Sequence, residues 1–315
     1  MNILIAGGTG FVGQYLTRRY LQKHHTVTIV GRSLPHIKKV FGKTVQALDW
    51  NSLQEKSHSI IHNQALIINL AGAGIADQRW TTARRREILD SRIIPTQLLS
   101  RLCAELKEAS PPLFNASAVG YYGIQTPIQE GLPPALDETT PAGNTSEFAP
   151  FIVKSWEAAT ESAKNARVRV VNMRFGVVLG EKGGMVQRLK LPFLLGLGGK
   201  MGSGRQPISW IALTDLARAI DFLLPLAIAG PVNIIAPGSV TQKQFAKTFA
   251  HVLKRPALIR IPAALLKVRY GQMAHELLLN GQHGYPTVLL ENGFNFQYPA
   301  LEKALKMAVG FDKHH

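Results

Sequence analysis

The chain is poor in cysteine and has no long apolar run. Cys103 is the single thiol among 315 residues, which excludes an internal disulfide and is typical of a reducing compartment. We interpret Cys103 as a packing residue, because it lies in an amphipathic stretch. No apolar run reaches the roughly 18 residues of a membrane helix, and Gly7, Gly8 and Gly10 interrupt the N-terminal one, unlike a signal peptide. These absences predict a soluble, cytoplasmic protein with no membrane partner.

Metal-binding patterns are also scarce. Of the ten histidines, His24-His25 and His314-His315 are adjacent pairs, and one cysteine cannot form a Cys-x-x-Cys motif. We interpret the closing residues 313–315 as a tail and predict no metal site.

Acidic side chains are outnumbered. The 36 Lys and Arg against 20 Asp and Glu give a net charge of +16, and residues 1–48 contain seven cations and no acid. Such a charge attracts nucleotides, acidic substrates or nucleic acid. A second cationic cluster consists of Arg79, Arg84, Arg85 and Arg86, with Arg92 beyond it. We interpret this cluster as the solvated face of a helix.

A glycine-rich turn lies close to the start of the chain. Residues 3–13 read I-L-I-A-G-G-T-G-F-V-G, an apolar run that breaks into Gly7, Gly10 and Gly13 before a helical pattern. The N–H groups and the dipole of a helix start hold phosphates, and glycines let the backbone approach them closely. The strand, turn and helix context predicts a dinucleotide site rather than an ordinary turn.

Strand and helix patterns alternate along the first three quarters of the chain. This order predicts a Rossmann-type α/β fold, a doubly wound parallel sheet. After Pro237 the pattern becomes helical, near 241–253, 262–269 and 272–280. The expected strands are 2–6, 26–30, 66–70, 113–117, 168–173 and 232–236, and the expected helices between them are 11–22, 81–108, 147–165 and 212–225.

The end of the second expected strand indicates which cofactor is used. NAD-binding proteins carry an acid about 20 residues past the glycines, whereas a nearby Arg suits the 2′-phosphate of NADP. This chain has Arg32 and Ser33 there and no acid before Asp49. We therefore predict NADP(H), with Arg32 on the 2′-phosphate; a plain surface Arg is the alternative.

Several further motifs carry a family resemblance. The chain resembles the extended, epimerase-like form of the short-chain dehydrogenase/reductase superfamily, and more narrowly its atypical YfcH-like NAD-dependent epimerase/dehydratase family. The resemblance runs from Met1 to about residue 306. It rests on Asn69-Leu70-Ala71-Gly72, the run from Asn115 to Gly123, Trp156-Glu157-Ala158-Ala159, the run from Arg174 to Gly180, Gly202-Ser203-Gly204-Arg205-Gln206 and Ser209-Trp210-Ile211.

The resemblance implies a division of the chain and a set of site residues. It implies a dinucleotide-binding domain over 1–179, to which 211–237 return, and a smaller C-terminal substrate lobe of 180–210 and 238–306. Asp49 would face the adenine, and Ser117 would lie close to the nicotinamide. The remaining implied cofactor contacts are Gly7, Thr9, Gly10, Phe11, Val12, Gly13, Leu70, Ala71, Gly72 and Arg174.

One expected catalytic motif is missing. The superfamily uses a Tyr and a Lys four positions later on one helix face, where the ammonium lowers the tyrosine pKa from about 10. None of the seven tyrosines has a Lys at that spacing, and the matching stretch around Phe148 and Ala149 has no Tyr. Tyr121 and Tyr122, just past Ser117, are the candidates to replace it; aromatic packing is their alternative role.

Arg92 stands where the extended pattern has an Asn. A guanidinium facing the cofactor binds a phosphate or a substrate carboxylate; a surface salt bridge to Asp90 or Glu87 is the alternative.

These observations leave three functional hypotheses. The first is an NADP-dependent oxidoreductase or epimerase acting on a small sugar-like or carbonyl substrate. The second, motivated by the missing Tyr–Lys pair, is a non-catalytic NADP-sensing binding protein. The third, RNA binding, rests on charge alone and lacks a recognisable RNA module, so we expect no specific nucleic acid. An oligomer is compatible with the sequence.

Overall fold

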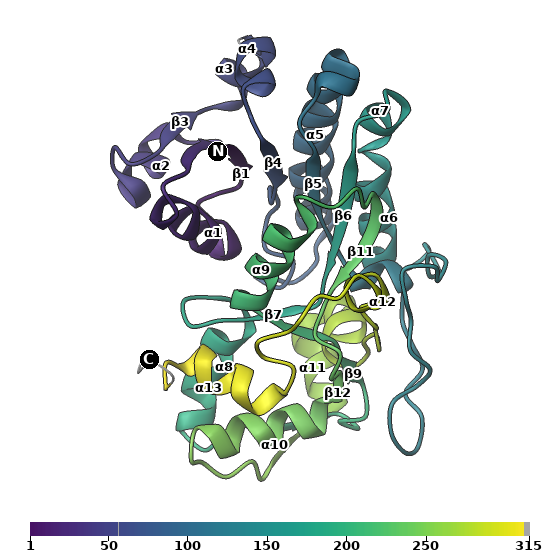
Figure 1. The fold of residues 1–315 in the computed structure, drawn as a ribbon. Helices are drawn as coiled ribbons and strands as arrows, with labels where there is room; N and C mark the ends of the chain where they lie inside the picture. Colours follow the sequence, from purple (N-terminus) through teal and green to yellow (C-terminus); the bar gives the residue numbers. More distant parts are fainter. Residues whose placement is uncertain (56, 312–315) are drawn as a thin grey trace.

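The computed structural model describes residues 1–55 and 57–311. Its centre is a seven-stranded parallel sheet with the order β11-β6-β5-β4-β1-β2-β3, which confirms the doubly wound α/β prediction (Figure 1). The strand order reverses between β1 and β4, where ligands bind in open α/β sheets. The strands are β1 (Asn2–Ala6), β2 (Thr26–Val30), β3 (Gln46–Leu48), β4 (Leu66–Asn69), β5 (Leu113–Ala118), β6 (Val170–Phe175) and β11 (Gly230–Ile234).

Alternate side chains of these strands are buried on opposite faces. In β1, Ile3 and Ile5 join one buried cluster, while Leu4 and Ala6 join another. Burial on both faces explains why the strands are continuous apolar runs. The first face is covered by α1 (Phe11–Gln22), α2 (Leu34–Phe41) and α9 (Leu213–Leu223), and the second by α3 (Trp50–Glu55), α4 (Ser57–His62), α5 (Thr82–Leu106) and α7 (Glu161–Asn165).

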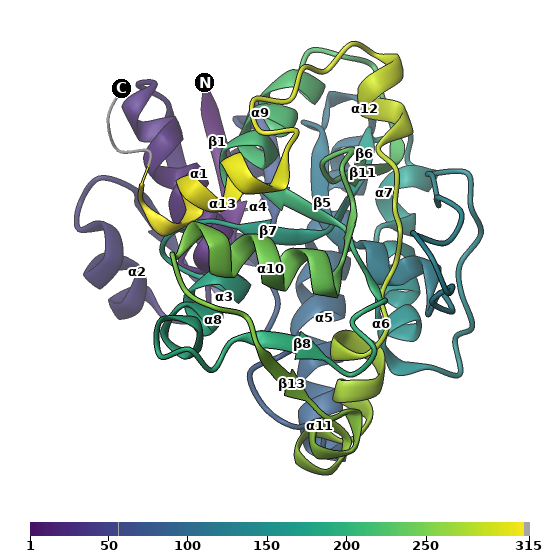
Figure 2. The same ribbon diagram turned by 90° about the horizontal axis from the view of Figure 1, so that it is seen from below.

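The C-terminal part forms a smaller lobe that shares the buried cluster of the first face, and Figure 2 shows its helices from below. Short strand pairs connect it: β7 (Val177–Leu179) with β10 (Trp210–Ala212), β9 (Pro207–Ile208) with β12 (Val240–Thr241), and β8 (Gly199–Met201) with β13 (Ile259–Ile261). Its helices are α8 (Gly184–Leu194), α10 (Gln242–Val252), α11 (Ala263–Tyr270), α12 (Thr287–Glu291) and α13 (Leu301–Val309).

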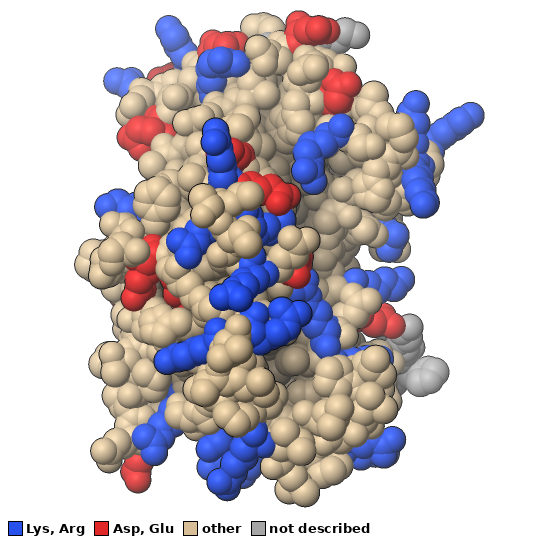
Figure 3. All heavy atoms as spheres, turned by 180° about the vertical axis from the view of Figure 1, so that it is seen from behind, with Lys and Arg blue, Asp and Glu red and all other residues tan. Residues whose placement is uncertain are grey.

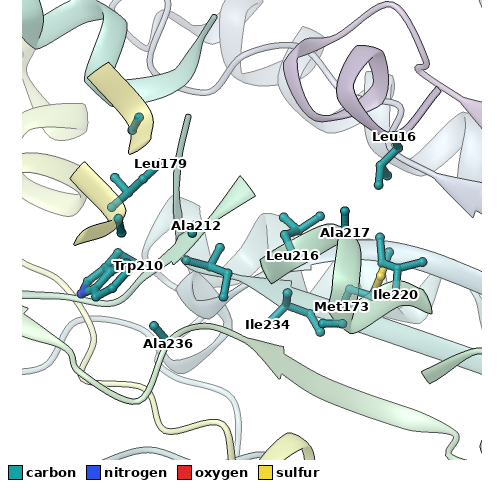
Figure 4. Close-up of a cluster of buried hydrophobic side chains, with 14 of the residues drawn as sticks. Leu16, Met173, Leu179, Trp210, Ala212, Leu216, Ala217, Ile220, Ile234 and Ala236 are labelled. Atoms are coloured by element: carbon teal, nitrogen blue, oxygen red, sulfur yellow. The ribbon is translucent and has the colours of Figure 1, made fainter. Parts of the chain in front are cut away.

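One buried cluster runs through both parts. Phe245, Phe249 and Leu305 of the lobe belong to the same cluster as Ile3 and Ile5 of the sheet. Figure 4 shows the middle of this cluster, from Leu16 on α1 through α9 to Trp210. The lobe is therefore fused to the sheet rather than tethered to it, and the boundaries at 180 and 238 stay a prediction.

Asp215 joins the two parts through hydrogen bonds. Asp215 lies in the first turn of α9, where a carboxylate interacts favourably with the helix dipole. Its fully buried carboxylate also accepts the amides of Gln297 (2.9 Å) and Tyr298 (2.8 Å) and a bond from Arg218 (2.8 Å). Asp215 thereby fixes the position of the segment that precedes α13.

The structure differs from the sequence expectations in several elements. The helix expected over 147–165 is two helices, α6 (Phe148–Ala158) and α7, and the stretch 272–280 contains a π-helical turn, η3 (Ala274–Leu278). Strand β3 was missed because its three residues carry no clear alternation. Helices α2, α3, α4, α8, α12 and α13 were also missed.

Candidate functional site

The glycine turn after β1 is built for close backbone approach. Gly7 has φ +74°, and a Cβ there would lie 2.7 Å from the Leu70 carbonyl oxygen of the neighbouring loop. A Cβ on Gly13 would lie 2.5 Å from the Gly7 oxygen, so both positions exclude side chains. The loops after β1 and β4 consequently touch at the point where the strand order reverses.

The start of α1 suits a diphosphate. Gly10 is its N-cap and offers no side-chain cap, and the first turn contains no acid. The amides of residues 11–13 donate to no other residue in the described part of the chain. These free N–H groups and the helix dipole are what a phosphate requires. The ring of Phe11 packs against the loop that contains Gly183, so only its backbone faces this site.

Arg32 and Ser33 lie together between β2 and α2. Arg32 is exposed and makes no ion pair within residues 1–55 and 57–311, while the Ser33 hydroxyl accepts the His36 amide as the N-cap of α2. The Asp49 carboxylate accepts the Ser52 amide at 2.7 Å, and this bond holds the pKa of Asp49 below its usual value. This edge thus offers an unpaired cation, a hydroxyl and a carboxylate.

The loop after β4 lies over a buried arginine. A Cβ on Gly72 would approach the Arg92 Cζ to 3.3 Å, and Ala73 is held by a bond from its amide to Ser91. Arg92 is 9% exposed and has no ion pair among the described residues. The alternative interpretation of Arg92, a surface salt bridge to Asp90 or Glu87, is wrong, because Glu87 pairs with Arg84 and Asp90 with Arg86.

A buried polar layer crosses the sheet on the α5 and α6 face. Asn69, Asn115 and Asn172 are register partners in β4, β5 and β6, and their amides are linked at 2.7 Å and 3.2 Å. Thr96 of α5 accepts from Asn69 (2.7 Å) and from the Trp156 indole (3.0 Å). Because buried amides need partners, these bonds fix where α5 and α6 sit.

A second row of buried polar side chains lies two residues further along β5 and β6, at the carboxyl end of the sheet. Ser117 and Arg174 are register partners, and both meet Glu157 of α6. Arg174 binds the Glu157 carboxylate through two nitrogens at 2.8 Å and 2.9 Å, and the Ser117 hydroxyl donates to the same carboxylate. Burial opposes the charge on Arg174, but Glu157 outweighs it, so the pKa of Arg174 lies above its ordinary value.

The two candidate tyrosines follow in η2 (Val119–Tyr122) and differ in their contacts. The Tyr122 hydroxyl is buried, donates to Asn233 (2.7 Å) and accepts from Arg174 (3.1 Å). Burial raises the pKa of Tyr122 to about 12. The Tyr121 ring lies 3.5 Å from the Arg174 guanidinium, and its hydroxyl has no hydrogen-bond partner among the described residues.

The face of α6 that looks at η2 carries no proton-transfer pair. A Cβ on Gly120 would lie 3.6 Å from Val153 and 4.0 Å from Ala149, which are four residues apart and buried. Apolar side chains thus occupy the spacing at which a Tyr and a Lys would act together.

Neither a candidate metal centre nor a membrane-spanning helix is present in residues 1–55 and 57–311. No group of three or more His, Cys, Asp and Glu side chains there could hold a metal ion, and no helix has the length and apolarity to cross a bilayer. The prediction from the sequence took His-x-x-x-His spacing to be absent, which is wrong: His58 and His62 have it, and their rings stack 6.0 Å apart. Residues 313–315 lie outside the described part. Cys103 is buried in the core, as expected.

Several members of this site were not predicted from the sequence. Glu157 and Asn233 were not singled out, although they bind Ser117, Arg174 and Tyr122. Polar residues inside apolar strands, such as Asn172, were the available signal, because a buried amide is costly unless it has a partner.

Comparison with known families and proteins gives consistent matches. The model of the NAD dependent epimerase/dehydratase family matches residues 3–235, and a domain of unknown function, DUF1731, matches residues 261–308. Epimerase family protein YfhF of Bacillus subtilis is 36% identical over 310 residues, with 98% of each chain covered.

Two solved structures are similar over nearly the whole chain. One is the human epimerase family protein SDR39U1 (isoform 2) with NADPH, with a TM-score of 0.84 and 33% identity over 98% of this chain and 99% of that one. The other is a nucleoside-diphosphate sugar epimerase from Corynebacterium glutamicum, with a TM-score of 0.76 and 27% identity over 99% of this chain and 58% of that one.

Proposed function

Because this chain belongs to the NAD dependent epimerase/dehydratase family, we propose that it is an NADP(H)-binding, epimerase-like oxidoreductase for a small sugar-like or carbonyl substrate. The observation that carries the cofactor choice is Arg32, an unpaired cation at the end of β2 with no acid within residues 1–48. The NADPH found with the human relative supports the same choice.

The chain offers binding groups for each part of this cofactor. The amides of residues 11–13 would hold the diphosphate, Arg32 and Ser33 the 2′-phosphate, and Asp49 the adenine edge. Residues 70–72 would line the adenosine ribose. When bound, the cofactor supplies hydride transfer at its nicotinamide; the protein must then move a proton at the substrate oxygen.

We assign that proton to Tyr121, because its hydroxyl has no protein partner among the described residues and its ring is held on Arg174. Tyr122 is the positioning residue, since its hydroxyl is shared between Asn233 and Arg174. Ser117 donates to Glu157, so toward a substrate it accepts a hydrogen bond. The single buried thiol, Cys103, supports a reducing, cytoplasmic setting.

Calorimetric titration with NADPH and NADH tests the cofactor assignment. We expect NADPH to bind at least tenfold more tightly than NADH, and Arg32→Gln to remove most of this preference while leaving NADH affinity unchanged, because only NADPH carries the 2′-phosphate. Lys43→Gln, an exposed cation beyond α2, is the matched control. Equal affinities for the two cofactors in the unmodified protein would contradict the assignment.

The catalytic assignment is tested by NADPH oxidation with a panel of carbonyl compounds. Tyr121→Phe should lower kcat by about 10²–10⁴-fold, the usual contribution of a general acid. The control is Tyr285→Phe, which removes the hydroxyl of an exposed tyrosine outside η2 and should leave kcat unchanged. A Tyr121→Phe enzyme with normal kcat refutes the role of Tyr121.

A non-catalytic NADP sensor is the second candidate. The apolar pair Ala149 and Val153 favours it, because these residues occupy the spacing on α6 opposite Gly120 at which a Tyr and a Lys would transfer a proton. Tight NADPH binding without turnover of any compound in the panel would favour the sensor over the enzyme.

A further inference from the structure

Arg92 places a charge at the carboxyl end of β4. It lies on α5, one turn before Pro95, and its guanidinium lies between the loop after β4 and helix α6. On one side a Cβ at Gly72 would be 3.3 Å from Cζ; on the other, the indole of Trp156 lies 5.0 Å away. Trp156 directly precedes Glu157, which binds the Ser117 hydroxyl. Arg92 therefore stacks on the same helix, α6, that binds Ser117, the residue that we place toward the substrate.

This charge is not balanced by the protein. Arg92 is 9% exposed, and its one hydrogen bond runs from Nη1 to the Ile88 carbonyl oxygen at 2.9 Å, which leaves Nε and Nη2 without partners among the described residues. The nearest acids on its helix are taken by Arg84 and Arg86. Burial, with a smaller effect from Arg84, lowers the pKa of Arg92 to about 10, so the guanidinium is still charged at neutral pH.

A buried cation is costly unless an anion compensates it. Cation–aromatic stacking on Trp156 orients the guanidinium and supplies no counter-charge. The two free nitrogens form one edge of the planar guanidinium, the geometry that binds a carboxylate or phosphate through two parallel bonds. The missing counter-charge is therefore that of a ligand.

We propose that Arg92 anchors an oxyanion of the substrate, so that the substrate is a carbonyl or hydroxyl compound bearing a carboxylate or a phosphate. This proposal rests on the proposed function, since it takes Ser117 and Tyr121 as the reacting end of the site. The same chemistry has a second source, the diphosphate of the cofactor, because Gly72 of the loop after β4 lies against Arg92.

The test uses the full-length protein saturated with NADPH, titrated with oxalate or inorganic phosphate against sodium chloride of equal ionic strength, with thermal unfolding as the readout. We expect both anions to raise the unfolding temperature in a saturable way. Arg92→Gln should weaken this response at least tenfold and change NADPH affinity less than twofold. It should also raise the unfolding temperature of the ligand-free protein, because it removes an uncompensated buried charge.

Arg84→Gln is the matched control, because Arg84 is equally buried on the same helix but paired with Glu87. We expect it to lower the unfolding temperature and leave the anion response intact. Absence of an anion response in the unmodified complex, or an unchanged response in Arg92→Gln, overturns the proposal.

The expected result differs if Arg92 binds the diphosphate of the cofactor instead of an oxyanion of the substrate. In that case Arg92→Gln weakens NADPH binding at least tenfold and the NADPH complex ignores both anions, which overturns the substrate assignment. If the unmodified protein binds no NADPH, the proposed function fails instead, and an anion response of the cofactor-free protein that depends on Arg92 would still identify the anion site.

Discussion

At the scale of single residues, Glu157 is the centre of the buried polar row. It is 8% exposed and accepts bonds from both Ser117 and Arg174. Removing one member of a buried ion pair leaves the other uncompensated, which costs about 3–5 kcal/mol. We expect Glu157→Gln to lower the free energy of unfolding by about 3 kcal/mol in urea denaturation, since the amide keeps some hydrogen bonds.

The control for this substitution is Glu161→Gln on the neighbouring α7. Glu161 lies 3.9 Å from Lys164, and its side chain is 61% exposed, so its loss should cost less than about 0.5 kcal/mol. Equal effects of the two substitutions on the free energy of unfolding would show that the Glu157 charge does not stabilise the fold through Arg174.

Some residues of the site could be predicted from local sequence, and others could not. Gly7, Gly13 and Arg32 belong to a short strand, turn and helix unit, in which spacing alone indicates position. Glu157 is 40 residues from Ser117, and only the packing of α6 on the sheet brings them together. The isolation of Arg92 was also unpredictable, because acids stand near it in sequence but pair with other arginines.

At the scale of elements, α1 and α9 are connected by an ion-pair network with a clear pH dependence. Asp221 of α9 contacts Lys23 at 2.7 Å and Arg19 at 2.8 Å. Burial alone would raise the pKa of Asp221, but the two cations outweigh it and lower this pKa. A carboxyl group with a lowered folded-state pKa stabilises the fold above its unfolded value of about 3.9, and this contribution is lost as the pH falls through the folded-state pKa.

We therefore expect Asp221→Asn to cost about 1 kcal/mol of unfolding free energy at pH 7. The difference between variant and unmodified protein should shrink toward zero as the pH falls below about 4. Urea denaturation at pH 7, 5 and 3 measures it, with Asp90→Asn, an exposed pair within one helix, as control. A difference that stays constant from pH 7 to pH 3 would contradict this assignment.

Long elements with strong patterns were predicted well, and short ones were not. The pattern over 81–108 predicted α5 as one helix despite Pro95, and the structure confirms it. The break between α6 and α7 depends on Thr160, whose buried hydroxyl donates to the Glu157 carbonyl at 2.6 Å. Helix α13 was missed because its apolar residues pack against distant parts of the chain, and the sequence alone does not reveal that packing.

At the scale of the whole molecule, the positively charged side chains are concentrated on part of the surface. Figure 3 shows Lys and Arg in a band over the lower half of one face, with few acids between them. A cavity of about 480 Å³ at the start of α10 is lined by Lys200, Arg205, Lys243 and Lys247 and by no acid. Such a surface attracts polyanions without reading a sequence.

We expect weak binding of single-stranded RNA in filter assays at 50 mM salt and its loss at 200 mM, because each neutralised phosphate contributes a slope of about −0.7 in log K against log salt. Lys247→Glu should weaken this binding more than Arg101→Glu, an exposed cation on α5. Binding that persists at 200 mM salt would instead revive an RNA-binding function.

The interior that both parts of the molecule share limits how the chain can be recombined. Two different family models match its N-terminal and C-terminal segments, yet Phe249 and Leu305 belong to the same buried cluster as Ile3 and Ile5. A chimaera that takes its last 75 or so residues from a relative would inherit mismatched side-chain volumes beneath the nucleotide domain. Exchange between relatives should therefore succeed only when the buried surface of α9 is transplanted along with the segment.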